Sequence, residues 1–582
     1  MRQLVCGPLL IAIATWGLLL LTLDGVGERP ALPDGPGLTL DEVFNVEMGI
    51  YHWRVLLDEG PLLWTPAGAR RAFQQPNYNP DHPPLGRLAI GIAHDVVQAV
   101  APASHVATGP SGRPVGISLY AARVSAATLF ALTVWLVGVV TTRWYGAFAG
   151  NIAAGSLPLM PRLFGHAHLA SLETFVGFAC TLTILAAASY LSRRGEVQAP
   201  PPPRWRAVLL VGVCLGLALL TKIQAILLPI PIGVWLIWQW RWRGLAMAVL
   251  FGLTGVAVFI IGWPWLWDDL VANLLTYLGR STDRIPLHCY YFGQQWQDKE
   301  VPWHYSIFMF LVTVPLGLQF LGGWALWTCW QRHRTTLKTA DQPSQKVASH
   351  SDGIDPRLVL ILANILFPLG FFAVPGITVY DGVRLFLPVF PLWAIFIGLG
   401  AATLREILCQ RWPNFFVNSQ KASWAIVALF LCQGLGSTLT HPCQLSYYNG
   451  LIGGPSGAAS LGFEATYWRD SITRDLLQEV ADKVPEGATI YVAPVLHPAN
   501  RTDLQLLSPT LSKHRLQLDS YDSNDPAKLP RMQYVLVFRR HADPWASLEP
   551  SPRGATLLAE VRRDNVQLAA LYQLPPAPQP SR

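Results

Sequence analysis

The chain has 582 residues, of which 51% are hydrophobic and only 14% are charged, and its net charge is +7. Soluble domains carry roughly 25% charged residues, so this composition argues against a disordered chain, a coiled coil or a nucleic-acid-binding domain. Eight cysteines are too few for a disulfide scaffold. Because the basic residues stand between long apolar runs, the sequence predicts a polytopic membrane protein with no nucleic-acid partner.

The apolar runs predict about eleven transmembrane helices, since a bilayer requires roughly 20 apolar residues for each crossing. The first run has no small-x-small cleavage site before Asp24 and is therefore predicted to remain as a helix. Two of the segments, 144–160 and 207–222, are short for a crossing. The predicted segments are 4–23, 115–140, 144–160, 168–191, 207–222, 224–240, 244–266, 305–330, 358–379, 385–404 and 422–440.

The basic residues of the short loops predict the orientation, because cytoplasmic loops are enriched in Lys and Arg. With a cytoplasmic amino terminus, the cytoplasmic segments hold sixteen basic residues. The short outer loops then hold only Arg162, Arg384 and three residues between 267 and 304. We therefore expect a multi-pass protein of the cell (inner) membrane with an extracytoplasmic carboxyl terminus.

Two large segments then lie outside. Residues 1–441 form the predicted transmembrane domain and include a first outer loop, 24–114, in which 85–100 has the amphipathic pattern of a helix lying in the membrane interface. Residues 442–570 are predicted to form a small α/β domain, and 571–582 a Pro-rich disordered tail. Within this domain the patterns indicate a helix at 470–483 and strands at 488–494 and 533–539.

Three ionisable residues lie inside the predicted helices: Arg123, Glu173 and Lys222. Such a group costs roughly 2.5–3.5 kcal/mol at the centre of a membrane helix, which favours a function for it. All three fall in the outer part of their helices, as if they served a site at the outer surface. The alternative interpretation is that Arg123 and Lys222 snorkel to the interface and that Glu173 pairs with one of them.

The outer loops contain further candidate residues. In LTLDEVFN, Thr39 and Glu42 fit a capping box that starts a helix, which leaves Asp41 free. A cluster of His166, His168 and Glu173 has ligand types that bind metals, although an H-x-H pattern is weak support for a metal site. The remaining candidates are His82 and Arg87 in DHPPLGR, and Asp381 and Arg384 at the outer end of a predicted helix.

These motifs resemble those of the GT-C glycosyltransferases of family 39, which include protein O-mannosyltransferases and bacterial aminoarabinose transferases. Asp41–Glu42 is similar to their DE pair, DHPPLGR to their HPPLGK segment, and Arg123 to the Arg of their R-x-x-S-A helix. The segments 381–402 and 441–468 resemble an uncharacterised bacterial branch. Glu173 stands where many relatives have Asp, and no MIR-type domain is present, which argues against a eukaryotic-like mannosyltransferase.

The resemblance implies a membrane glycosyltransferase that moves a hexose or pentose from a polyprenyl-phosphate donor to a lipid, glycan or protein acceptor on the extracytoplasmic side. It implies inversion with Asp41 as general base, with Glu42 as a second catalytic residue. No cofactor is expected, although a divalent metal stays open. The residues expected to bind the donor or substrate are His82, Arg87, Arg123, His166, His168, Glu173, Lys222, Asp381 and Arg384.

Two other classes of protein stay open from the sequence. A lipid flippase or transporter would place ionisable groups at mid-membrane depth and would not need Asp41. A polysaccharide ligase or polymerase also combines many membrane helices with a large outer loop.

Overall fold

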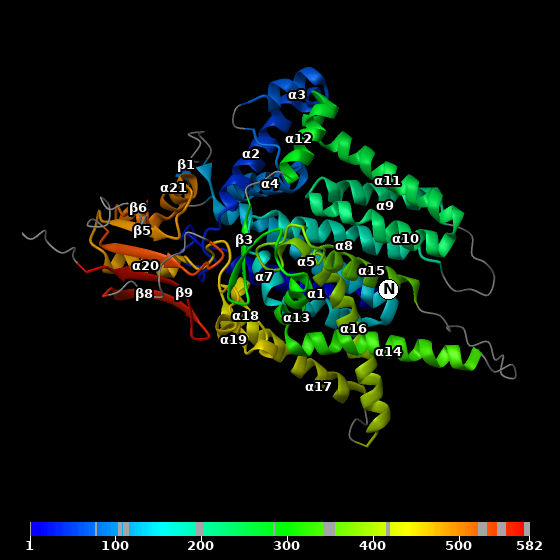
Figure 1. Cartoon of the computed structure of the whole chain (residues 1–582). Coiled ribbons are helices and arrows are strands. Elements are labelled where there is room, and N and C mark those ends of the chain that lie inside the picture. The colour runs from blue at the N-terminus through cyan, green and yellow to red at the C-terminus, as the bar shows by residue number, and fades with distance from the viewer. Residues whose placement is uncertain are drawn as a thin grey trace, which may run out of the picture.

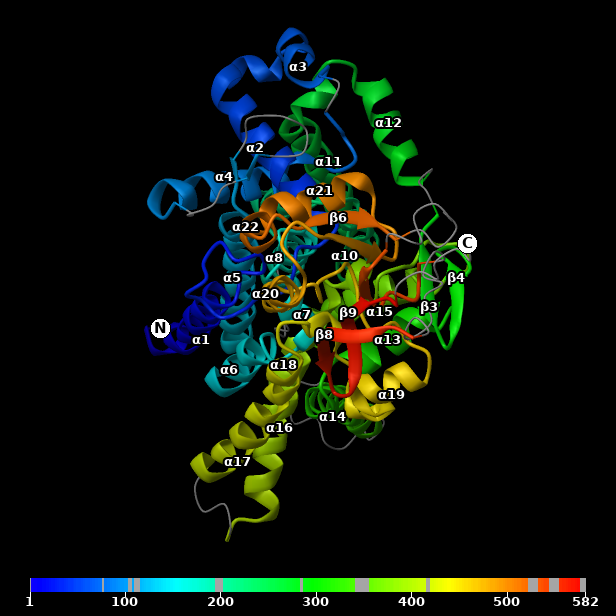
Figure 2. The ribbon, with the colours of Figure 1, turned by 90° about the vertical axis from the view of Figure 1, so that its left-hand side faces the viewer.

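The structure is a computed structural model that describes residues 2–75, 78–102, 107–108, 116–193, 203–282, 286–340, 355–414, 419–521, 532–543 and 554–575. A large helical part lies beside a smaller part that contains a five-stranded sheet (Figure 1). In the view of Figure 2 the sheet faces the viewer and covers one end of the helical part. The predicted fold class, an α-helical membrane protein with a C-terminal α/β domain, is confirmed.

Every predicted membrane segment contains helix, but the predicted number of eleven crossings is not reproduced. Six described helices are long and apolar enough to span a membrane, or seven if α13 and α14, bent by 113°, form one span. The helices in these segments are α1 (Arg2–Leu21), α5 (Leu119–Tyr145), α6 (Ala147–Ser156), α8 (Leu172–Tyr190), α9 (Trp205–Leu219), α10 (Pro229–Trp240), α11 (Trp242–Gly262), α13 (Tyr305–Thr313), α14 (Leu316–Ala340), α15 (Pro356–Phe371), α16 (Val389–Arg411), α17 (Ser419–Leu431) and α18 (Leu435–Thr440).

Some predicted segments are too short as helices to cross. Helix α6 has ten residues, because Gly146 with φ of 90° separates it from α5. Helices α9 and α15 have fifteen and sixteen residues. The short helical segments between the longer helices are α7 (Pro161–His166), η2 (Ile223–Leu227), η3 (Pro264–Trp267), η4 (Arg384–Phe386), η5 (Cys432–Gly434), η6 (Gln444–Ser446), η7 (Gly450–Ile452) and α19 (Gly454–Ser460).

The two ends of α5 contact different parts of the chain. Near its start, α5 carries Arg123, which bonds to Glu42 of the first outer loop, and at its other end the Tyr145 hydroxyl donates to Asp355 at 2.8 Å. The amino terminus lies away from the sheet (Figure 1). Arg123 therefore lies at the end of α5 that is near Glu42, and Asp355 lies at the opposite end.

The segment predicted as the first outer loop forms the helices α2 (Glu42–Glu59), η1 (Gly60–Trp64), α3 (Pro66–Phe73) and α4 (Pro84–Val100). Helices α2 and α4 cross at glycines: a Cβ at Gly91 would stand 2.1 Å from the carbonyl oxygen of Gly49. On α4, Arg87 and His94 are buried in the protein, whereas Val96 and Val100 near the end of the helix are 55% and 82% exposed.

The smaller part contains one mixed sheet with strand order β6-β5-β7-β9-β8. Strand β5 runs parallel to β6 and β7, and β9 is antiparallel to β7 and β8. Its elements are α20 (Arg474–Lys483), β5 (Thr489–Ala493), α21 (Pro498–Leu507), α22 (Pro509–Lys513), β6 (Gln517–Ser520), β7 (Tyr534–Phe538), β8 (Thr556–Arg563) and β9 (Val566–Gln573).

The disordered tail was predicted to begin too early. Strand β9 continues to Gln573 because it pairs with β7 and β8, and residues 576–582 lie outside the described part of the chain. The remaining elements are α12 (Leu270–Thr282) and two hairpins, β1 (Ala107–Thr108) with β2 (Gly116–Ile117) and β3 (His288–Tyr291) with β4 (Gln294–Gln297).

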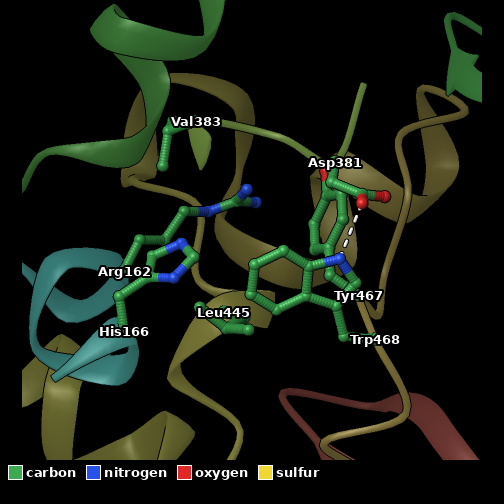
Figure 3. A pocket seen from close by; sticks show the side chains of 7 residues that line it. All are labelled: Arg162, His166, Asp381, Val383, Leu445, Tyr467 and Trp468. Atoms are coloured by element: carbon green, nitrogen blue, oxygen red, sulfur yellow. Dashed lines mark hydrogen bonds between the residues drawn. The ribbon is translucent and has the colours of Figure 1, made fainter. Parts of the chain in front are cut away.

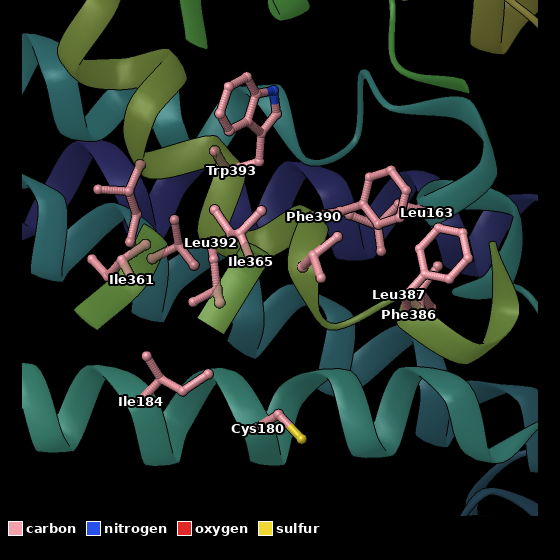
Figure 4. Close-up of a cluster of buried hydrophobic side chains, with 14 of the residues drawn as sticks. Leu163, Cys180, Ile184, Ile361, Ile365, Phe386, Leu387, Phe390, Leu392 and Trp393 are labelled. Carbon is pink, nitrogen blue, oxygen red and sulfur yellow. The ribbon is translucent and has the colours of Figure 1, made fainter. Parts of the chain in front are cut away.

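The apolar core fixes the helices on which the candidate site depends. Ile184 of α8, Ile365 of α15 and Leu392 of α16 belong to one buried cluster (Figure 4). Close packing of such side chains leaves little freedom to the elements that carry them. The start of α8, with Glu173, and η4, with Arg384, are therefore held at fixed positions.

Candidate active site

Glu173 is the centre of a buried ion cluster. The Arg384 Nε donates to Glu173 Oε1 at 2.6 Å, and Lys222 Nζ donates to the same oxygen. The side chains of Glu173 and Lys222 are 1% and 4% exposed. Glu173 lies at the start of α8, Lys222 follows α9, and Arg384 begins η4. Buried charges of this kind require partners, and the three segments supply them to one another.

Asp41 is the solvent-exposed carboxylate of this cluster. Arg384 Nη2 donates to Asp41 Oδ2 at 2.7 Å, and the Asp41 side chain is 46% exposed. Although Asp41 is the N-cap residue of α2, its side chain makes no capping bond. The carboxylate is thus held at the edge of the buried cations, and one side of it stays accessible.

Asp381 occupies the other side of Arg384, in a backbone conformation with φ of 53°. Its Oδ2 accepts bonds from Trp468 Nε1 at 2.6 Å and from Arg384 Nη1 at 3.3 Å, and its Oδ1 accepts one from Arg540 Nη2 at 3.1 Å. The Arg384 guanidinium also lies over the Trp468 ring, 4.0 Å from its centroid. Trp468 and Arg540 were not predicted as site residues.

A small pocket opens beside Asp381. Arg162 and His166 face the Trp468 ring across it (Figure 3). Arg162 Nε donates to the carbonyl oxygen of Tyr447 at 2.9 Å, but among the described residues its Nη2 has no hydrogen-bond partner, and neither has His166 Nδ1. The pocket is lined by Arg162, His166, Asp381, Val383, Leu445, Tyr467 and Trp468.

The two unpartnered nitrogens are available to a polar ligand. Burial lowers the pKa of His166 to about 4, so its ring is neutral at pH 7. Sequence reasoning used Arg162 only as a loop charge. Its spacing of four residues from His166, which puts both on one side of a helical turn, is the signal that could have identified it.

Glu42 and Arg123 were predicted as a catalytic and a donor-binding residue, but they form an ion pair with each other. Both side chains are fully buried, and Arg123 donates to Glu42 at 2.8 and 2.7 Å. The other Arg123 donors bind the backbone carbonyls of Leu23, Pro36 and Gly37. The pair is saturated, so we leave both residues out of the proposed chemistry. The predicted capping contact is present in part, since Glu42 accepts the Thr39 N–H at 2.9 Å.

Arg87 and His168 also have structural partners. Arg87 is buried and bonds to Asp81 at 2.7 and 3.1 Å, and despite burial its charge lowers the pKa of that carboxyl. The His168 ring bonds to the Thr22 hydroxyl and to the Phe164 carbonyl oxygen, each at 2.9 Å. Among the described residues, neither Arg87 nor His168 forms a hydrogen bond with Glu173, Lys222 or Arg384. Neither is therefore part of the proposed site.

His82 lies at the edge of the site. Burial lowers the pKa of its ring to about 3, and the charges of Lys222 and Glu173 act on it. Its Nδ1 has no partner among the described residues.

A metal site was left open by the sequence. The described residues include no group of three or more His, Cys, Asp or Glu side chains that could hold an ion.

The alternative interpretation, in which Arg123 and Lys222 snorkel to the interface and Glu173 pairs with one of them, agrees with the structure only in part. Glu173 does pair with Lys222, as that interpretation required. Neither Arg123 nor Lys222 reaches toward an interface, because both are buried inside the protein.

Comparison with known families found a matching family model. Residues 69–324 match the sequence model of the family described as dolichyl-phosphate-mannose-protein mannosyltransferase. This match covers less than half of the chain, and it agrees with the resemblance seen in the motifs and with the expectation of a membrane glycosyltransferase. No curated protein sequence matches the chain.

Three solved structures show a distant similarity. ArnT from Cupriavidus metallidurans bound to undecaprenyl phosphate is 13% identical over 97% of both chains, with a TM-score of 0.46. The oligosaccharyltransferase AglB from Archaeoglobus fulgidus is 12% identical over 91% of this chain and 69% of its own, with a TM-score of 0.44. The Pmt1–Pmt2 protein O-mannosyltransferase of S. cerevisiae is 16% identical over 47% and 33%, with a TM-score of 0.24.

Proposed function

We propose that this protein is a GT-C glycosyltransferase of family 39 that transfers a sugar, with inversion, from a polyprenyl-phosphate donor to an acceptor hydroxyl or amine at the extracytoplasmic face of the cell membrane. One observation carries the proposal. A half-exposed carboxylate, Asp41, adjoins two buried cations, Arg384 and Lys222, that share a single oxygen of Glu173. This arrangement supports a role for Asp41 as the base and for the two cations as the site of an anionic leaving group.

The transfer proceeds by a single displacement. Asp41 accepts the proton of the acceptor O–H or N–H while the acceptor atom forms a bond to the anomeric carbon. The bond between that carbon and the phosphate oxygen breaks, and its electron pair leaves with polyprenyl phosphate. Arg384 and Lys222 stabilise the charge that develops on this phosphate, which is the role of preorganised cations in a site with little water.

Arg384 links donor binding to the base. Its Nη2 is bonded to Asp41 at 2.7 Å while its Nε holds Glu173. A donor phosphate that engages Nη2 would release the Asp41 carboxylate to the acceptor. In this proposal the base becomes free only when the donor is in place, which limits unproductive reaction.

The lipid chain of the donor has apolar surface next to these cations. A cavity lined in part by Leu385 and Phe386, the residues that follow Arg384, lies between α8, η2, α15 and α16. An isoprenoid tail suits such a lining because burial of apolar surface is favourable. The lining residues are Cys180, Ile184, Gln224, Leu227, Leu228, Asn364, Pro368, Leu385, Phe386, Pro388 and Leu392.

The sugar is assigned to the neighbouring pocket. Arg162 Nη2 and His166 Nδ1 have no described partner there, and Trp468 offers an aromatic ring. Sugar hydroxyls suit the two nitrogens, and their binding would remove the penalty of unpaired buried polar groups. His82 is proposed to contact the donor from the edge of the cluster.

The transporter alternative is less well supported. It requires charged groups near mid-membrane depth, whereas Glu173 begins α8, Lys222 follows α9 and Arg384 precedes α16. The cations thus gather where the helices end.

The test is transfer by the purified protein. Polyprenyl phosphates carrying labelled hexoses or pentoses are incubated with membrane acceptors, and labelled product and free polyprenyl phosphate are both measured. We expect both to appear together, and no transfer from a nucleotide sugar. Movement of the intact donor across vesicle membranes without its consumption would contradict the proposal and support a transporter.

A further inference from the structure

The end of strand β7 of the C-terminal sheet contacts the ion cluster directly through the side chain of Arg540. Arg540 follows strand β7 by two residues, and its Nη2 donates to Asp381 Oδ1 at 3.1 Å. The Arg540 and Asp381 side chains are 13% and 6% exposed. The ion pair is therefore shielded from water, where such an interaction is much stronger than at an exposed surface.

The turn that carries Arg540 is held in place on both sides. The Glu464 carboxylate accepts the N–H groups of His541 and Ala542 at 2.9 and 2.7 Å. Thr466 Oγ1 donates to the Arg539 carbonyl oxygen at 2.7 Å, and Gln295 Nε2 of the β3–β4 hairpin donates to that of His541 at 2.6 Å. Four bonds to this short turn indicate a built contact between the domain and the site.

The charges of the cluster show what Arg540 contributes. The three carboxylates of Asp41, Glu173 and Asp381 face the three cations Lys222, Arg384 and Arg540. Without Arg540, Asp381 has only Arg384 as a counter-charge among these groups. Arg384 would then be drawn toward Asp381, from which its Nη1 is now 3.3 Å, and away from Asp41.

We propose that Arg540 is a positioning residue of the transferase: it neutralises Asp381, so that Arg384 stays directed toward Asp41 and the donor phosphate. The C-terminal domain then completes the active site. This inference rests on the proposed function of the cluster. It assigns no direct contact with substrate to Arg540, which acts through Asp381 and Arg384.

The experiment compares Arg540→Gln with a matched control, Arg539→Gln. Arg539 is the preceding residue, but its guanidinium bonds to Gln567 and Tyr572 inside the C-terminal sheet. We expect Arg540→Gln to lower kcat/KM for the lipid donor by about tenfold or more, which matches the loss of a hydrogen bond to a charged group. Arg539→Gln should stay within about threefold. Arg540→Lys should recover part of the activity, since it keeps the charge but not the guanidinium fork.

A double-mutant cycle separates positioning from a general effect on folding. In an Asp381→Asn background no charge needs neutralising, so adding Arg540→Gln should lower kcat/KM by less than about threefold, whereas independent effects would multiply. Two results would overturn this inference and leave the proposed function standing. One is that the effects of Asp381→Asn and Arg540→Gln on kcat/KM multiply. The other is that the wild type is active but Arg540→Gln has the same kcat/KM as Arg539→Gln. An inactive wild type with every donor would instead overturn the proposed function. In that case, the rise in Tm that added undecaprenyl phosphate causes is measured for the same single and double variants. Positioning predicts that Arg540→Gln reduces this rise in the wild-type background but not in the Asp381→Asn background, and independent effects in both backgrounds would overturn the inference.

Discussion

Replacement of Arg123 should damage the fold and not the binding of donor. Its guanidinium gives all five N–H groups to Glu42 and to the carbonyl oxygens of Leu23, Pro36 and Gly37. Arg123→Ala leaves the Glu42 carboxylate buried without its hydrogen-bonded ion partner, a change that costs about 3–5 kcal/mol in buried ion pairs. Replacing both partners, as in Arg123→Met with Glu42→Gln, should destabilise the protein less than Arg123→Ala alone, because no uncompensated charge remains.

Thermal unfolding of the purified protein in detergent measures this loss. The control is Arg70→Ala, which breaks an ion pair of 2.9 Å with Asp268 in which the Arg70 side chain is 60% exposed. An exposed pair of this kind contributes about 0–1 kcal/mol, so Tm should change little. At a temperature where Arg123→Ala is folded, its affinity for polyprenyl phosphate should equal that of the wild type. A variant with unchanged Tm and weakened affinity would refute this reasoning and return Arg123 to the donor site.

Three further predictions concern separate parts of the site and its support. Lys222→Met should weaken binding of polyprenyl phosphate in a titration, because one of the two cations on Glu173 is lost; unchanged affinity would remove Lys222 from the phosphate site. His166 has a pKa of about 4 in the folded protein against 6.5 ordinarily, so between these values the unfolded chain binds more protons and stability falls as pH drops from 6.5 toward 4. In unfolding measured across this range, His166→Gln should lessen that acid loss, and an identical pH dependence would contradict the shift. Gly91→Ala should lower Tm, since its Cβ would lie 2.1 Å from the Gly49 carbonyl oxygen and push α2 from α4; an unchanged Tm would argue against this helix crossing.

The sequence predicted the helical membrane part well because apolar runs are local signals. It predicted the number of crossings less well, since a bend such as that between α13 and α14, or a break such as Gly146, depends on how neighbouring helices pack. In the C-terminal domain, helix α20 and strands β5 and β7 were expected from their patterns. Strands β6, β8 and β9 were not expected. Strand β6 pairs with β5 across an intervening pair of helices, whereas β8 and β9 form a local hairpin whose turn, Asp564–Asn565, is a signal that the sequence analysis missed.

The candidate site shows the same division. Asp41, Glu173, Lys222 and Arg384 were selected from their motifs and their positions in the predicted helices, and the structure brings them together. Spacing alone could not tell that Arg123 reaches back to Glu42, 81 residues earlier in the chain. Nor could it place Arg540 beside Asp381, 159 residues away. Such pairings follow from tertiary packing, so no local pattern reports them.

The most direct test of the central claim compares the two adjacent acids of the first outer loop. Single-turnover transfer of a labelled sugar from the polyprenyl-phosphate donor is measured for Asp41→Asn and Glu42→Gln, together with the Tm of each. The Asp41 side chain is 46% exposed and that of Glu42 is fully buried. The account predicts that Asp41→Asn abolishes transfer at an unchanged Tm, whereas Glu42→Gln lowers Tm and leaves partial activity in the folded fraction. Transfer at the wild-type rate by folded Asp41→Asn would contradict it.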